Sequence, residues 1–133
     1  MKIIPHGAAR EVTGSCHEIQ VNGKKILLDC GLFQGHRQES AVKNAEFPFN
    51  PAEIDAMVLS HAHADHVGRV PLLSKKGFNA PIHCTYATKD LAAVMLADSA
   101  YINTKDEEYF CKYLAKSMMQ CDGPLYTIED AEE

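Results

Sequence analysis

The sequence predicts an α/β protein, and two features of its 133 residues indicate this class. Short apolar runs occupy the first half, and two of them, residues 17–21 and 24–29, flank the dipeptide Asn22-Gly23. That dipeptide favours a type I′ turn because both positions tolerate a positive φ, so the two runs are interpreted as a hairpin. In the second half, apolar residues recur at helical spacing instead.

Further strands are predicted around this hairpin. Residues 2–4 form the first, and the second arm of the hairpin ends in LLDCGLFQG, which brings Asp29 to a glycine-flanked loop at the edge of a sheet. Asp29 could also simply cap a turn. The apolar run AMVLS at residues 56–60 predicts a strand buried on both faces.

Two helices are predicted after Thr88, a candidate N-cap. Their apolar positions are interpreted as core packing: Leu91, Val94, Met95, Tyr101 and Ile102 in the first, and Phe110, Tyr113, Leu114 and Met118 in the second. The stretch 127–130 has the spacing of a capping-box variant, which predicts a new helix just before the last residue, Glu133. A truncated chain and a frayed acidic tail both explain this pattern.

Composition narrows the class of protein. With 46% hydrophobic and 23% charged residues, the chain is expected to form one globular domain. Its net charge of −5 works against indiscriminate binding to nucleic acid or an anionic membrane. No apolar run reaches the roughly 18 residues of a membrane span, so we expect a soluble, cytoplasmic protein. Five cysteines without a CxxC pair predict neither a disulfide framework nor a cysteine zinc site, and buried, reduced thiols are favoured.

The hexapeptide HAHADH carries four metal-binding side chains directly after the predicted buried strand: His61, His63, Asp65 and His66. Imidazole and carboxylate are ligands for a borderline metal such as zinc. Neighbouring residues such as Asp65 and His66 diverge, so two metals sharing the segment are easier to accommodate than one. Two ions about 3.5–4 Å apart activate water for hydrolysis, and Asp65 is the local candidate to orient or deprotonate that water. The alternative is a cluster of surface histidines.

These residues also resemble a known family. The hexapeptide matches the HxHxDH signature of the metallo-β-lactamase superfamily. Together with GAAREVTGSCHEI, ILLDCGLFQG and APIHCTYAT, in this order, it resembles the amino-terminal part of the β-CASP branch, which contains RNA-processing nucleases. The resemblance implies a four-layer αββα sandwich with a dinuclear zinc site at one edge.

The resemblance also implies a role for each site residue. His61 and His63 correspond to ligands of the first zinc, and Asp65 and His66 to ligands of the second. Asp65 would also orient the attacking water, which makes it the catalytic candidate, and Asp29 would support the metal-binding loop. The polar loop that holds Arg10, Glu11, Thr13 and Ser15 resembles a family loop near the metal edge, although solvated turn residues are an equal interpretation.

The family completes its site with a later histidine, a bridging aspartate and a final histidine, and it carries a β-CASP insertion. None of these falls within residues 1–133. We therefore expect a truncated amino-terminal part of a metallo-β-lactamase domain, with a partial αββα sandwich and without the insertion. Because ligand number sets affinity, four ligands alone would bind zinc weakly.

Three functions remain open at this point. The first is a zinc-dependent RNA phosphodiesterase that uses two-metal activation of water, with RNA as the partner of the complete protein. The second is a metallohydrolase of a thioester or small ester. The third is a non-catalytic fragment or one component of a split enzyme, which would associate with a second copy or a complementing chain. By resemblance, GAAREVTGS and LFQG favour the first.

Overall fold

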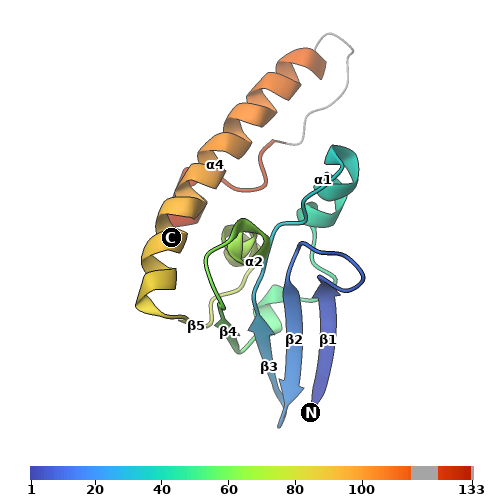
Figure 1. The fold of residues 1–133 in the computed structure, drawn as a ribbon, viewed down its shortest axis with the longest axis vertical. Coiled ribbons are helices and arrows are strands. Elements are labelled where there is room, and N and C mark those ends of the chain that lie inside the picture. Colours follow the sequence, from blue (N-terminus) through green and yellow to red (C-terminus); the bar gives the residue numbers. More distant parts are fainter. Residues whose placement is uncertain (115–122, 133) are drawn as a thin grey trace.

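One mixed sheet lies at the centre of this computed structural model, which describes residues 1–114 and 123–132 (Figure 1). Within that part of the chain the sheet has five strands in chain order: β1 (Lys2–Gly7), β2 (Cys16–Val21), β3 (Lys24–Leu28), β4 (Ala56–Val58) and β5 (Ile82–His83). Strands β1 to β3 pair antiparallel, and β3, β4 and β5 pair parallel. The α/β class predicted from the sequence is confirmed.

Helices fill the two connections between the parallel strands, and in the described part of the chain two more helices follow the last strand. They are α1 (Arg37–Ala45), the short 3-10 helix η1 (Pro51–Glu53), α2 (Ala64–Val67), α3 (Val70–Lys75), α4 (Tyr86–Leu114) and α5 (Ile128–Glu132). Helix α1 and η1 join β3 to β4, and α2 and α3 join β4 to β5. Helix α4 then runs from β5 past the end of the sheet (Figure 1). No helix of the described residues is long and apolar enough to cross a membrane.

The predicted hairpin is confirmed. Asn22 and Gly23 have φ values of 49° and 77°, the positive values that the type I′ turn requires. The two arms pair in register, with Val21 opposite Lys24 and His17 opposite Leu28. Strand β1, predicted to cover residues 2–4, extends further, to Gly7.

The helices cover one face of the sheet. Leu27 and Met57 are register partners on this face, and both are fully buried. They belong to a core that includes Val67 of α2, Leu73 of α3 and further residues of α4. This packing produces one sheet layer and one helix layer, the arrangement expected for the amino-terminal part of the sandwich.

The other face of the sheet is apolar and partly open. Ile3, Ile19, Ile26 and Ala56 are successive register partners, so their side chains form a row across four strands. Ile3 is 57% exposed, and Val58, one pleat further along β4, is 39% exposed. The prediction that strand 56–60 is buried on both faces is therefore wrong for this chain, because nothing among the described residues covers this face.

Helix α4 differs from the prediction in length and orientation. One helix replaces the two predicted, and it starts three residues earlier, because Thr85 rather than Thr88 caps it: the Thr85 hydroxyl accepts the Thr88 N–H at 3.2 Å. The interpretation of its large apolar residues as core is wrong for six of them, which are exposed: Leu91, Val94, Tyr101, Ile102, Phe110 and Tyr113. Met95 does pack against the core, as predicted. The helix packs through smaller residues and Leu96, because small side chains allow close approach. Met118 lies outside the described residues.

The predicted capping box is confirmed at the start of α5. The Thr127 N–H donates to the Asp130 carboxylate at 2.8 Å, and the Asp130 N–H donates to the Thr127 hydroxyl at 3.3 Å. Helix α5 lies against α3 and α4, where the Asp130 carboxylate also accepts a hydrogen bond from Lys75 at 3.1 Å.

The cysteines only partly follow the prediction. Cys16 and Cys30 are buried free thiols, and burial together with neighbouring Cys16 raises the pKa of the Cys30 thiol well above its ordinary value. Cys84 is free but exposed, and Cys111 is disulfide-bonded, which the sequence did not predict. Cys121 lies outside the described residues.

Candidate metal centre

The candidate metal site lies at the edge of the sheet where β3 and β4 end. Because these strands are parallel neighbours, Asp29 and Ser60, which follow them, lie on the same edge. The Asp29 N–H donates to the Val58 carbonyl at 2.9 Å, so the two loops begin side by side. The hexapeptide 61–66 then leads into α2, which begins at Ala64.

Asp29 accepts hydrogen bonds from three neighbouring residues. Its Oδ1 accepts the Ser60 N–H at 2.8 Å, and its Oδ2 accepts the Ser60 hydroxyl at 2.8 Å and the Ser15 hydroxyl at 3.3 Å. The same Oδ2 lies 2.8 Å from Nδ1 of His66. Asp29 is 3% exposed and has a φ of 60°, a left-handed conformation that aspartate adopts more readily than most residues. The Asp29 carboxylate therefore contacts both the residue before the hexapeptide and one of the predicted ligands.

The four predicted ligands lie in one cluster. The ring centroid of His61 is 4.6 Å from that of His63 and 4.0 Å from that of His66. Nε2 of His61 is 3.1 Å from Nδ1 of His63, and Nε2 of His66 is 3.7 Å from Oδ2 of Asp65. His63 is exposed and the other three are partly exposed, so the cluster reaches solvent. Because Nδ1 of His66 faces Asp29, Nε2 is the nitrogen left for a metal.

Backbone contacts hold this cluster against the loop after β3. The N–H groups of Cys30 and Leu32 donate to the carbonyls of His66 and Ala64 at 2.7 and 2.9 Å. Gly31, between them, leaves no space for a side chain, because a Cβ there would overlap the carbonyl of Asp65. Glycine is therefore required at position 31, the last residue of LLDCG, because the hexapeptide backbone lies so close.

Arg69 connects the same loop to α1 and to two aromatic side chains. It is 1% exposed, its Nε donates to the Gly31 carbonyl at 2.7 Å, and its guanidinium lies 4.8 Å from the ring centroids of both Phe33 and Phe47. The same guanidinium donates to two carbonyls at the end of α1 and just after it. The buried charge is thus stabilised by carbonyls and aromatic faces.

The donor chemistry of the cluster fits a borderline metal ion such as zinc. In the described ranges, 1–114 and 123–132, no group of three or more His, Cys, Asp and Glu side chains is arranged as a formed metal site. His61 and His63 face one another with their ring nitrogens instead. The fit therefore rests on the donor types and on their gathering beside Asp29, not on a coordination sphere already in place.

The sequence profile of the "Metallo-beta-lactamase superfamily" matches residues 9–100, more than half of the chain and all of the hexapeptide. The chain belongs to the metallo-β-lactamase superfamily. The resemblance predicted from HAHADH is thereby confirmed. Two relatives of this chain, a ribonuclease and a transcription termination factor, belong to the β-CASP branch, which confirms the predicted branch as well.

The relatives are considerably longer than this metallo-β-lactamase chain. A ribonuclease from Thermus thermophilus is 48% identical over 110 residues, which are 83% of this chain and 25% of the relative. The transcription termination factor FttA from Methanococcus maripaludis is 35% identical over 116 residues, 86% of this chain and 18% of the relative. The chain thus spans a quarter or less of these relatives.

Among solved structures, human short-form tRNase Z aligns with a TM-score of 0.43 and 16% identity, covering 92% of this chain and 40% of that structure. The family assignment comes from the sequence match.

The remaining candidate residues of this metallo-β-lactamase chain separate into two groups. Ser15 is buried and contacts Asp29, whereas Arg10 and Glu11 of the same loop are exposed. His6 lies outside the hexapeptide and pairs with the buried Glu18 at 2.9 Å. Sequence reasoning did not single out Ser60, although its position directly before the hexapeptide was a signal that could have identified it.

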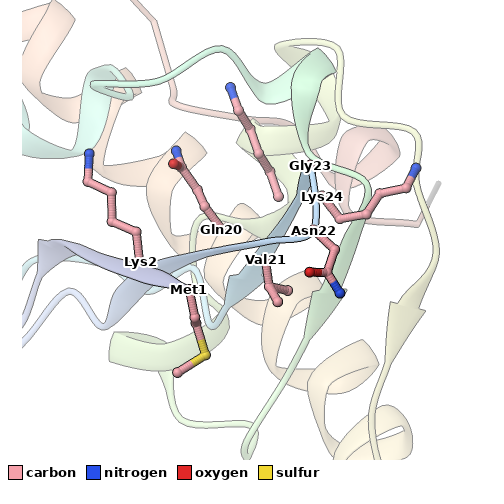
Figure 2. A pocket seen from close by; sticks show the side chains of 8 residues that line it. Met1, Lys2, Gln20, Val21, Asn22, Gly23 and Lys24 are labelled. Carbon is pink, nitrogen blue, oxygen red and sulfur yellow. The ribbon is translucent and has the colours of Figure 1, made fainter.

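A separate pocket of about 350 Å³ lies at the opposite end of the sheet, around the hairpin turn (Figure 2). Lys2, Lys24 and Lys25 line it. Two of these charges are already paired, Lys24 with Asp55 at 2.7 Å and Lys25 with a glutamate of η1. The pocket is therefore a weak candidate for an anion site, and the hexapeptide edge remains the functional site of this metallo-β-lactamase chain.

Proposed function

We propose that this chain carries the metal-binding front of a zinc-dependent RNA phosphodiesterase. The observation that carries the proposal is the gathering of the four hexapeptide side chains beside Asp29 at one open sheet edge. Hydrolytic metal centres need imidazole and carboxylate ligands with access for water, and both are present. RNA as the substrate is supported by the 48% identity with a ribonuclease.

Each site residue has a role in this proposal. Zinc would be held by the four hexapeptide side chains His61, His63, Asp65 and His66. The complete family site holds two zinc ions. Bound zinc would supply a Lewis acid and a water of lowered pKa. The Asp65 carboxylate would orient or deprotonate that water, and Asp29 fixes the His66 ring. Since the chain has a net charge of −5, the basic surface that RNA needs must come from elsewhere.

The test is zinc-dependent cleavage of RNA by the full-length protein and its Asp65→Ala variant. The loss of a positioned acid–base group lowers the rate by about 10²- to 10⁴-fold, so cleavage by Asp65→Ala should be barely detectable while its circular dichroism is unchanged. Asp98→Ala, an exposed aspartate on α4, is the matched control and should cleave normally. Cleavage of a thioester but not of RNA would favour the ester hydrolase, and an undiminished rate for Asp65→Ala would contradict the proposed role.

A second candidate role is favoured by the open face of the sheet. Ile3 in the apolar row and Val58 next to the row are exposed, and exposed apolar surfaces of this kind are typical of association sites. In this role, residues 1–133 form a non-catalytic component that a second copy or a complementing chain covers. Such a component would self-associate and would cleave no RNA alone.

A further inference from the structure

The hydroxyl of Ser60 lies between two predicted metal ligands and the buried carboxylate beside them. Its Oγ is 2.8 Å from Oδ2 of Asp29, 3.0 Å from Nδ1 of His61 and 3.4 Å from Nδ1 of His66. The Ser60 N–H also donates to Oδ1 of Asp29 at 2.8 Å. Two hydrogen bonds to one carboxylate therefore fix the position of this hydroxyl beside the histidines.

The donors and acceptors at Ser60 determine which nitrogen of His61 carries hydrogen. The Ser60 hydroxyl donates to Oδ2 of Asp29 at 2.8 Å, so its single hydrogen lies in that contact. Only oxygen lone pairs then remain to face His61. The 3.0 Å contact consequently requires His61 to donate from Nδ1, which leaves the lone pair of a neutral imidazole on Nε2.

The neighbouring histidines are consistent with this assignment. Nδ1 of His66 is 2.8 Å from the carboxylate of Asp29 and must donate to it, so the lone pair of His66 is also on Nε2. With its lone pair on Nε2, His61 can accept a hydrogen bond from Nδ1 of His63 across 3.1 Å. One direction of hydrogen bonding thus satisfies all three rings without a conflict between two donors or two lone pairs.

We propose that Ser60 is a positioning residue that relays the hydrogen-bond acceptor of Asp29 to His61 and keeps Nε2 of that ring unprotonated, so that its lone pair can bind a metal ion. Asp29 sets His66 directly and His61 through Ser60, so one buried carboxylate orients two ligands. The effect on metal binding rests on the proposed function. The tautomer of His61 does not, because it follows from the protein's own side chains.

The loss of a group that orients a ligating histidine typically lowers metal affinity about 10- to 100-fold. Ser60→Ala removes the relay and should weaken zinc binding by about that factor. Ser60→Thr keeps the hydroxyl and should restore affinity to near the wild-type value.

The deciding measurement is the tautomer of His61 in the full-length protein, by nitrogen NMR of histidine-labelled protein. The sample is free of added metal and kept at a pH where imidazoles are neutral, and His61→Gln assigns the signal. In the wild type and in Ser60→Thr we expect Nδ1 of His61 to be protonated and Nε2 to be unprotonated. In Ser60→Ala we expect a mixture of the two tautomers.

Ser15→Ala is the matched control, because it removes another hydroxyl from Oδ2 of Asp29. Among the described residues, the Ser15 hydroxyl donates to Asp29 at 3.3 Å, and no hydrogen bond joins it to a histidine. Its His61 signal should therefore stay as in the wild type. An equal change in Ser15→Ala would mean that Asp29 acts without the Ser60 relay and would overturn the proposal.

Two other results would overturn it. One is a wild-type spectrum with hydrogen on Nε2 of His61, which decides the question even if Ser60→Ala does not fold. The other is a folded Ser60→Ala variant whose tautomer and zinc affinity both equal those of the wild type. Failure of the wild type to bind zinc or cleave RNA would contradict the proposed function instead, and the tautomer would still test the role of Ser60.

Discussion

At the scale of single residues, the candidate site depends on close approach between two loops. Asp29 and Gly31 follow β3. The Asp29 carboxylate contacts His66 of the hexapeptide, and Gly31 lets the hexapeptide backbone approach closely because it has no side chain. Both contacts are made to the segment that carries the predicted ligands. A small change in either residue should therefore displace the ligands without removing one.

Gly31→Ala tests this close approach. The new methyl group would overlap the Asp65 carbonyl, so the loops must separate, and we expect a loss of about 1–3 kcal/mol in the free energy of unfolding. Zinc affinity should fall as well. Urea unfolding and a zinc competition assay measure the two effects. Gly23→Asn is the control, because that turn glycine has nothing within 4 Å of an added Cβ and asparagine tolerates its positive φ. Equal effects of both changes would contradict this account.

At the scale of elements, Arg69 connects the start of α3 to the loop after β3 and to the end of α1. The planar guanidinium reaches three carbonyls while it lies against two aromatic rings, and lysine cannot reproduce this. The position of the metal-binding loop thus depends on a side chain that contacts none of the predicted ligands.

Arg69→Lys should lower the free energy of unfolding by about 1–3 kcal/mol, because it loses hydrogen bonds from a buried charged group. Arg37→Lys, an exposed arginine beside Phe110, should change it by less than about 0.5 kcal/mol. Chemical denaturation of the two variants measures the difference. A destabilisation by Arg37→Lys as large as that by Arg69→Lys would count against the anchoring role.

The orientation of α4 gives a second prediction at this scale. Leu96 is 8% exposed and Leu91 is 59% exposed on the same helix. Leu96→Ala should cost about 2–5 kcal/mol in the free energy of unfolding, because it leaves a cavity. Leu91→Ala should cost less than about 0.5 kcal/mol. Thermal and urea unfolding of both variants test this orientation, and the reverse order would require the helix to be rotated about its axis.

At the scale of the whole molecule, helices cover one face of the sheet, while the apolar row on the other face is partly open. Alternation of side chains along β3 and β4 places Leu27 and Met57 on the covered face. The same alternation places Ile26 and Val58 on the open face. In the second candidate role proposed above, the open face is the surface through which this chain would associate.

Val58→Lys should weaken self-association of the 133-residue chain about tenfold or more, because burial of one valine is worth roughly 1.5–3 kcal/mol. Val42→Lys, a 77% exposed valine on α1, should have no effect, because single exposed apolar residues are common on protein surfaces. Analytical ultracentrifugation over a range of concentrations compares the variants. Unchanged association of Val58→Lys would exclude the open face as the contact surface.

Local sequence patterns were sufficient for the hairpin, the capping box of α5 and the family signature. Each depends on residues a few positions apart: the φ preferences of Asn22-Gly23, the reciprocal bonds of Thr127 and Asp130, and the four donors of residues 61–66. They failed for most of α4, where helical spacing of large apolar residues predicted burial that occurs at Met95 but not at the exposed positions such as Leu91 and Tyr101. Periodicity identifies an amphipathic stripe but not the surface that covers it.

Only the tertiary structure established how the metal-binding loop is supported. Asp29 and Ser60 are 31 residues apart, and Asp29 and His66 are 37 apart, so their hydrogen bonds appear only when β3 and β4 pair. The steric need for glycine at position 31 and the burial of Arg69 have the same origin. The identity of the donors is local chemistry and can be taken from the sequence. Their orientation depends on contacts between distant segments, which no local pattern contains.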